Sequence, residues 1–332
     1  MFKKKISLSF AIILMVAGIG ISYFLMIKIG RKAPVEAVSD NAVMNCTYNL
    51  TRLGGYEFIR PLLFSEEECE SQKLIPIKNE LQSLISGYKN SGVITNASVY
   101  IRKLEQGEWI SIGEGEQYYP GSLLKVPELI TFMKMNERSP GLLDKKITYS
   151  TALNLPKQAI YVSKSIEVGK TYSIRELIYY MIAYSDNYAT MLLNQQMDVN
   201  IFKKVFIDLG IPEPDLTKKD IPITAKNYSY FMRALFNASY LSIDDSEYCT
   251  ELLSHSDFTG GMLNSLPRDI KVVHKFGEAG DGIDAHFNES GIIYINKSPY
   301  LITIMTKGKR NNDLPPIVSM ISKKVFDMIS ST

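Results

Sequence analysis

The sequence predicts an α/β (α+β) fold, in which the two ends of the chain build an antiparallel sheet with flanking helices. An all-helical lobe is inserted between the two parts of this sheet. An N-terminal transmembrane helix precedes the whole domain. Three observations predict this fold. Hairpin patterns lie near the two ends, helical periodicity dominates the middle, and an uncharged apolar run opens the chain. With 332 residues and a net charge of +2, the chain can bury a large core and shows no basic nucleic-acid surface.

The apolar run Ile6–Ile27 has 22 residues without a charge and follows three lysines. That length spans a bilayer, and no convincing cleavage site follows it. We expect an uncleaved anchor over residues 1–29 and a linker over 30–45, with a cleaved signal peptide as the alternative. Basic residues on the two sides nearly balance, so they leave the orientation open.

After the linker, apolar residues at helical spacing predict a helix over Leu74–Tyr88. The β-rich runs Ser98–Leu104 and Trp109–Ile112 then predict a hairpin. Near the other end, Gly291–Ile295 and Tyr300–Thr306 predict a second hairpin. A final helix follows, with one apolar face formed by Ile317, Ile321, Val325 and Met328.

The middle of the chain is mostly helical. Ser173–Glu176 has the form of a capping box before an apolar stripe, and Thr224–Phe236 follows a Pro-rich loop as another helix. We therefore predict one domain over residues 46–332, in which a helical lobe is inserted into an α/β lobe. An α/β lobe comprises residues 46–121 and 260–332, a helical lobe comprises 122–259, and a ligand cleft lies between the lobes.

The three cysteines do not form a disulfide framework. One bridge, with Cys46–Cys69 as the favoured pairing, or three free thiols would both fit. The histidines are scattered and have no metal-ligand spacing, so we predict no metal and no cofactor.

Ser122 and Lys125 stand three residues apart at a predicted helix start, and so share a face. A serine hydroxyl needs an adjacent base to act as a nucleophile, and a buried lysine of lowered pKa can serve. Exposed backbone N–H groups at the helix start offer an oxyanion site. The structural alternative is a capping serine with a solvated lysine.

Two further motifs follow. Ser185-Asp-Asn187 interrupts two apolar helices, where the hydroxyl could relay a proton and the amide could hold a substrate. Its structural alternative is a turn. Lys275-Phe-Gly277 reads as a strand with a glycine that permits close backbone approach, and its alternative is an edge-strand lysine.

In this order, the three motifs resemble those of the serine β-lactamase and penicillin-binding protein superfamily, specifically the class A β-lactamases. The resemblance covers roughly residues 74–328. It implies that Ser122 is the acylated nucleophile, with Lys125 as its base or proton shuttle. Ser185 would then protonate the leaving nitrogen.

The resemblance also implies the substrate-binding residues. Asn187 would position the substrate amide, and Lys275 would attract the substrate carboxylate and help lower the pKa of Lys125. The backbone N–H groups of Ser122 and Glu278 would form the oxyanion hole, with Gly277 between Lys275 and Glu278.

Two departures from the family pattern concern substrate binding and deacylation. Phe276 stands where the family has threonine, which removes a hydroxyl contact to the substrate carboxylate. The deacylating glutamate of the family lies on a long loop. Glu213, on the short connection 210–224, is the candidate here, and a solvated loop acid is its alternative reading.

Two neighbours of Lys275, His274 and Glu278, also have side chains that could act near the site. Strand alternation turns His274 to the other face, so we expect it to be structural. The Glu278 side chain could pair with Lys275 or replace the lost threonine hydroxyl.

The sequence therefore predicts a membrane-anchored, extracytoplasmic and monomeric serine hydrolase, which acts through an acyl-serine on a β-lactam or related amide. The alternative is a D-alanyl-D-alanine-type peptidase or a slow-deacylating sensor of β-lactams or peptidoglycan fragments. A structural membrane protein with chance motifs is the third reading.

Overall fold

The computed structural model of the chain describes residues 46–155, 158–218, 220–280, 282–295 and 298–331. The expected membrane anchor and linker, residues 1–45, lie outside the described residues. Within these ranges, every helix is too short or too polar to cross a bilayer.

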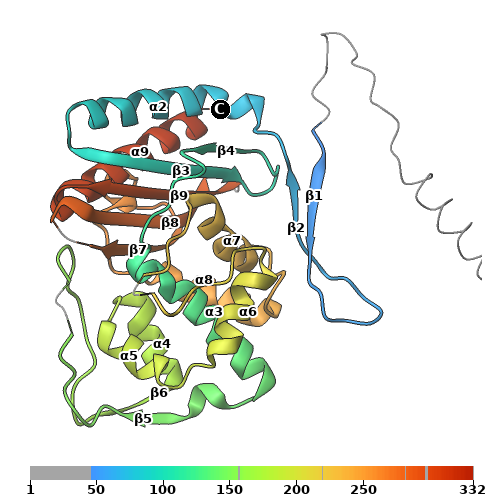
Figure 1. Cartoon of the computed structure of the whole chain (residues 1–332), viewed down its shortest axis with the longest axis vertical. Coiled ribbons are helices and arrows are strands. Elements are labelled where there is room, and N and C mark those ends of the chain that lie inside the picture. The colour runs from blue at the N-terminus through green and yellow to red at the C-terminus, as the bar shows by residue number, and fades with distance from the viewer. Residues whose placement is uncertain (1–45, 156–157, 219, 281, 296–297, 332) are drawn as a thin grey trace, which may run out of the picture. The chain divides into compact units, whose positions relative to one another are not determined.

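A five-stranded antiparallel sheet forms the centre of the fold (Figure 1). Its strand order is β4-β3-β9-β8-β7, so strands from both ends of the sequence pair in the middle. Both predicted hairpins, β3–β4 and β8–β9, are present. The strands are β3 (Ile94–Lys103), β4 (Trp109–Ile112), β7 (Val272–Ala279), β8 (Ala285–Ile295) and β9 (Ser298–Gly308).

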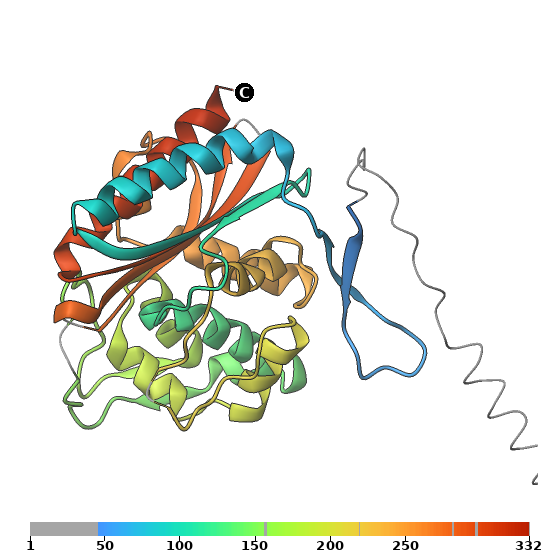
Figure 2. The same cartoon turned by 45° about the horizontal axis from the view of Figure 1, so that its top comes forward.

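Two long helices, α2 (Ile75–Asn90) and α9 (Leu314–Ser330), cover one face of the sheet (Figures 1 and 2). Helix α2 buries the apolar face that the sequence predicts, and α9 likewise buries Ile317, Ile321 and Val325. These residues join the inner side chains of the strands in one hydrophobic core.

The remaining helices lie on the other side of the sheet (Figure 2), where they enclose a second core. The predicted capping box is confirmed, because Ser173 and Glu176 bond each other's backbone N–H groups at the start of α4. These helices are α3 (Lys125–Arg138), α4 (Ile174–Ala183), α5 (Asn187–Asn194), α6 (Val199–Asp208), α7 (Ala225–Phe236) and α8 (Ile243–Ser254), with a small sheet of β5 (Lys146–Thr148) and β6 (Thr171–Ser173).

Short 3-10 helices link several elements. They are η1 (Gln72–Leu74), η2 (Gly121–Leu124), η3 (Leu142–Asp144), η4 (Met262–Ser265), η5 (Gly282–Asp284) and η6 (Asn311–Asp313).

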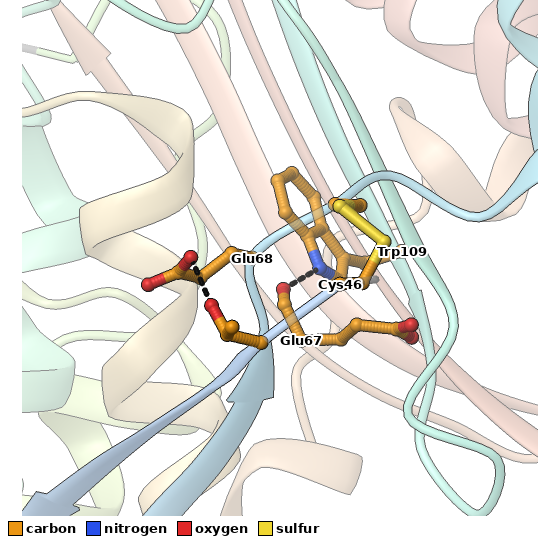
Figure 3. Close-up of a disulfide and its surroundings, with 6 residues drawn as sticks. Cys46, Glu67, Glu68 and Trp109 are labelled. Atoms are coloured by element: carbon orange, nitrogen blue, oxygen red, sulfur yellow. Dashed lines mark hydrogen bonds between the residues drawn. A yellow bond between two sulfur atoms is a disulfide. The ribbon is translucent and has the colours of Figure 1, made fainter. Parts of the chain in front are cut away.

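A separate hairpin of β1 (Tyr48–Arg52) and β2 (Leu62–Glu67) precedes this fold and was not predicted. A disulfide joins Cys46 to Cys69 at its base, which is the favoured pairing, and Cys249 is a buried free thiol. Beside the disulfide, the Trp109 indole donates a 2.7 Å hydrogen bond to the Glu67 carbonyl (Figure 3). The hairpin is thus fastened to the edge strand β4.

Candidate active site

Ser122 lies on η2, immediately before α3, and its side chain is partly exposed. The strand β7 packs closely against this turn. A methyl group on Gly277 would lie 2.2 Å from the Pro120 carbonyl oxygen and 2.9 Å from the Ser122 nitrogen. Glycine is therefore required at residue 277, and the backbone of β7 runs directly beside the serine.

Gly121 supports the same contact from the other side. Its φ is +56°, and an added methyl group would lie 2.1 Å from the Glu278 carbonyl oxygen. The two glycines bring the backbones of Ser122 and Glu278 together, at the place where the sequence predicts the oxyanion hole.

Lys125 is the first residue of α3, and its ammonium group is buried. Its Nζ donates hydrogen bonds to the Ser185 carbonyl oxygen at 2.6 Å, to Asn187 Oδ1 at 2.8 Å and to Ser185 Oγ at 3.2 Å. Burial lowers the pKa of Lys125 to about 8. The alternative of a solvated lysine is therefore wrong, and no side-chain cap from Ser122 is present at the helix start.

Ser185 is held between two lysines. Lys275 Nζ donates to Ser185 Oγ at 2.9 Å and to the Phe276 carbonyl oxygen at 3.0 Å. Burial and the charge of Lys125 lower the pKa of Lys275 well below its ordinary value. Ser185 itself has a φ of +53°, an unusual conformation for a residue with a Cβ. The structure thus joins Lys125, Ser185, Asn187 and Lys275 in one hydrogen-bonded cluster.

The turn that carries Ser185 is fixed by its neighbour Asp186. The Asp186 carboxylate caps α5 by accepting a hydrogen bond from the Tyr188 N–H, and it also accepts from Ser165 Oγ and the Ile166 N–H. A cavity of about 370 Å³ opens beside this turn. Its lining includes Tyr184, Asn187 and residues 162–165.

The side chain of Glu278 has a different role from either one the sequence suggested. Its two carboxylate oxygens each accept a 2.8 Å hydrogen bond, from the N–H groups of Ala159 and Ile160. Gln158 Nε2 donates to the Ser185 carbonyl oxygen at 3.1 Å. Residues 158–160 therefore bridge the strand β7 and the Ser185 turn.

The two residues that flank Lys275 on β7, His274 and Phe276, have buried side chains. The Phe276 ring is buried and stacks on Phe258 with ring centroids 4.0 Å apart. His274 faces away from Lys275, as expected, and makes a buried contact there, with its Nδ1 2.7 Å from Glu289 Oε1. Neither side chain adds a polar atom to the lysine–serine cluster.

Glu213 lies apart from this cluster. Its carboxylate is half exposed and pairs with Lys203 of α6 at 2.8 Å. In the described part of the chain, none of its hydrogen bonds or ion pairs joins it to Ser122, Lys125 or Ser185.

Glu128, a buried acid one helical turn after Lys125, is not among the residues that the sequence motifs single out. Asn194 Nδ2 donates to Glu128 Oε1 at 3.4 Å, and burial raises the pKa of this carboxyl to about 7. The signal in the sequence is an acid inside the apolar run Val126–Phe132, on the face of Lys125.

Comparison with known proteins agrees with this geometry. The model of the "Beta-lactamase enzyme family" matches residues 76–329. No curated protein matches the sequence.

Solved structures share the fold at low sequence identity. The structure of PBP-A is 18% identical with a TM-score of 0.65, over 78% of this chain and 97% of that one. A β-lactamase from Chitinophaga pinensis is 16% identical with a TM-score of 0.67, over 76% and 99%. A class A β-lactamase from Mycobacterium abscessus is 18% identical with a TM-score of 0.63, over 76% and 99%.

The family match spans most of the chain and includes every member of the lysine–serine cluster. The chain therefore belongs to the β-lactamase enzyme family, and it is a serine β-lactamase-like hydrolase with a class A fold.

Proposed function

We propose that this protein is a membrane-anchored, extracytoplasmic hydrolase that opens a β-lactam or a related amide through an acyl-Ser122 intermediate. One observation carries the proposal. Lys125 and Lys275 converge on Ser185 Oγ, at 3.2 and 2.9 Å, beside the turn that bears Ser122. Such a chain can move a proton from the nucleophile to the leaving group.

The acylation step follows from this arrangement. Neutral Lys125 accepts the Ser122 hydroxyl proton as Oγ bonds to the substrate carbonyl carbon. The oxyanion is bound by the N–H groups of Ser122 and Glu278. The amide C–N bond then breaks, and the leaving nitrogen takes a proton from Ser185, which Lys125 replaces.

Substrate binding would use the remaining groups. Lys275 supplies positive charge for a substrate carboxylate, and the 370 Å³ cavity beside Asn187 offers room for an amide side chain. The Phe276 ring has no hydroxyl and packs on Phe258 in the core, so its side chain makes no hydrogen bond to that carboxylate. A carboxylate would thus be held mainly by Lys275.

A second candidate is a D-alanyl-D-alanine-type peptidase or a slow-deacylating sensor. The position of Glu213 favours it, because this acid pairs with Lys203 rather than with the cluster. Acylation would then proceed, but no loop glutamate would activate the water for the second step. One compared structure is a PBP-A variant described as an acyl-enzyme complex with penicillin G.

The first experiment is intact-mass spectrometry of the full chain mixed with a penicillin and sampled over time. An adduct that decays within minutes, and is missing in Ser122→Ala, is the result expected of a hydrolase. A persistent adduct would favour the peptidase or sensor. If neither protein gains mass with a penicillin or with a D-alanyl-D-alanine thioester, the acyl-serine proposal fails.

The proposed location has its own support. The Cys46–Cys69 disulfide is typical of proteins outside the reducing cytosol. Protease added to intact cells should digest the domain from outside while the chain sediments with membranes. A domain that is protected until the cells are broken would contradict this orientation.

A further inference from the structure

Glu128 is a buried acid that the acylation step above leaves unused. It follows Lys125 by three residues on α3, so the two side chains share one helix face. Lys125 is 3% exposed and Glu128 is 7% exposed. A buried carboxylate is costly unless a proton, a cation or hydrogen bonds compensate its charge.

The polar contacts of the two residues place both side chains between α3 and α5. Lys125 Nζ bonds Asn187 at the start of α5, and Glu128 Oε1 accepts its hydrogen bond from Asn194 at the end of the same helix. Glu128 Oε2 is buried, and it has no hydrogen-bond partner in the described ranges. One buried acceptor, on the helical turn that follows Lys125, is therefore unsatisfied.

Other charges face Lys125 from the elements packed around it. Asp186 lies on the turn before α5, and Glu278 and Lys275 lie on β7. Asp186 is already bound by three donors, and Glu278 by two backbone N–H groups. Of the three acids Asp186, Glu278 and Glu128, Glu128 is the one with a buried carboxylate oxygen that accepts no hydrogen bond in the part of the chain that is described.

Burial moves the proton affinities of the two groups toward each other. Burial lowers the pKa of Lys125 to about 8 and raises the pKa of Glu128 to about 7. The attraction of Glu128 is the strongest charge interaction that opposes the loss of the Lys125 proton. Groups coupled in this way titrate as a pair.

We propose that Glu128 and Lys125 share one proton, and that Glu128 is the positioning residue that sets the pH at which Lys125 can accept the proton of Ser122. The inference rests on the proposed acyl-Ser122 chemistry. In the described residues no ion pair joins the ammonium to Glu128, so the shared proton requires one water between them, which would also be a partner for Oε2. An Nζ–H bond breaks, an Oε2–H bond forms, and the ammonium and carboxylate become an amine and a carboxylic acid.

The decisive variant is Glu128→Gln, which keeps the shape and an oxygen for Asn194 but cannot be charged. The carboxylate raises the pKa of Lys125, so its removal should lower that pKa by roughly one pH unit. NMR titration of the full chain with ¹³C-labelled lysine measures this directly, and Lys125→Met assigns the signal. The wild type should titrate in two coupled steps and the variant in one.

Acylation by a penicillin gives the second readout. Only neutral Lys125 acts as a base, so a lower pKa moves the rising limb of the pH–rate profile to lower pH. On that limb, Glu128→Gln should react up to about tenfold faster than the wild type. A purely structural role predicts slower acylation at every pH.

Asn194→Ala is the second variant and lies at an exposed position. It removes the donor that favours ionised Glu128, so it should shift the Lys125 titration in the same direction but less. If Lys125 titrates identically in the wild type and both variants, the shared proton is overturned, whatever the substrate. If the shift occurs but neither acyl donor modifies Ser122, the pair is supported and the proposed function fails.

Discussion

At the scale of single residues, Ser185 carries the most unusual combination of properties. It occupies a left-handed backbone conformation, with a φ of +53°, and its hydroxyl lies within 3.2 Å of two lysine Nζ atoms. Its carbonyl oxygen also accepts from Lys125 at 2.6 Å. The left-handed backbone thus places both oxygens of Ser185 within hydrogen-bond distance of Lys125, the proposed base.

Two substitutions at Ser185 test its hydroxyl and its left-handed backbone conformation separately. Ser185→Ala and Ser185→Gly should both slow acylation roughly 10²- to 10⁴-fold, because the proton path to the leaving nitrogen is lost. Glycine tolerates positive φ, so the glycine variant should unfold with a free energy about 1 kcal/mol greater than the alanine variant. Mass-spectrometric acylation rates and urea unfolding measure the two effects. Undiminished acylation in both variants would exclude Ser185 from the proton path.

At the scale of elements, the contact between β7 and η2 positions Ser122, the proposed nucleophile. The strand and the turn touch backbone to backbone at Gly277 and Gly121, so their separation sets the place of Ser122 relative to Lys275. Because closely packed backbones leave no space for an added group, a single methyl group at this contact should displace the turn.

Gly277→Ala tests this contact. The new methyl group would meet the Pro120 carbonyl oxygen at 2.2 Å and force Ser122 away from β7. Acylation should fall at least 100-fold, since a displacement of about 1 Å costs that much. Gly115→Ala is the matched control, because a methyl group there meets nothing within 4 Å. Similar acylation rates in both variants, measured by intact mass, would mean that the close approach does not position the serine.

The elements also show how far the sequence could be read. The hairpins β3–β4 and β8–β9 and the capping box of α4 were predictable, because each has a local pattern. Known motifs likewise single out Lys125, Ser185 and Lys275, which the structure joins by hydrogen bonds. The bond from Ala159 to Glu278 was not predictable, since 119 residues separate the partners and neither stands in a motif. Glu128 was hidden for another reason, because an acid within an apolar helix reads as a break in the pattern.

At the scale of the whole molecule, the β1–β2 hairpin lies before residues 76–329, which the family model matches. Besides the disulfide, a buried cluster fastens it. The Glu66 carboxylate bonds Arg233 at 3.0 Å and Tyr230 at 3.1 Å, and Phe64 stacks on Tyr230. The hairpin thus depends on α7, on the same side of the sheet as the site.

Glu66→Gln should destabilise the protein without altering the site. Loss of a buried charge that faces Arg233 costs about 3 kcal/mol of unfolding free energy at pH 7. Burial opposes ionisation of Glu66, but Arg233, Lys226 and Arg102 outweigh it and hold the pKa of Glu66 below its ordinary 4.5. Since the folded state lowers this pKa, the stabilisation is complete above pH 4.5 and is lost as the pH falls through the folded value.

Urea unfolding of the wild type and Glu66→Gln between pH 3 and pH 7 measures this dependence. The two free energies should differ most at pH 7 and converge toward pH 3. Glu80→Gln is the control, since the Glu80–Lys324 pair is largely exposed and should contribute less than 1 kcal/mol. If the wild type and Glu66→Gln differ by the same amount at every pH, the ion pair does not fasten the hairpin. Acylation of Ser122 at pH 7 should be unchanged, because the Glu66 cluster shares no hydrogen bond with Lys125 or Ser185 in the described residues.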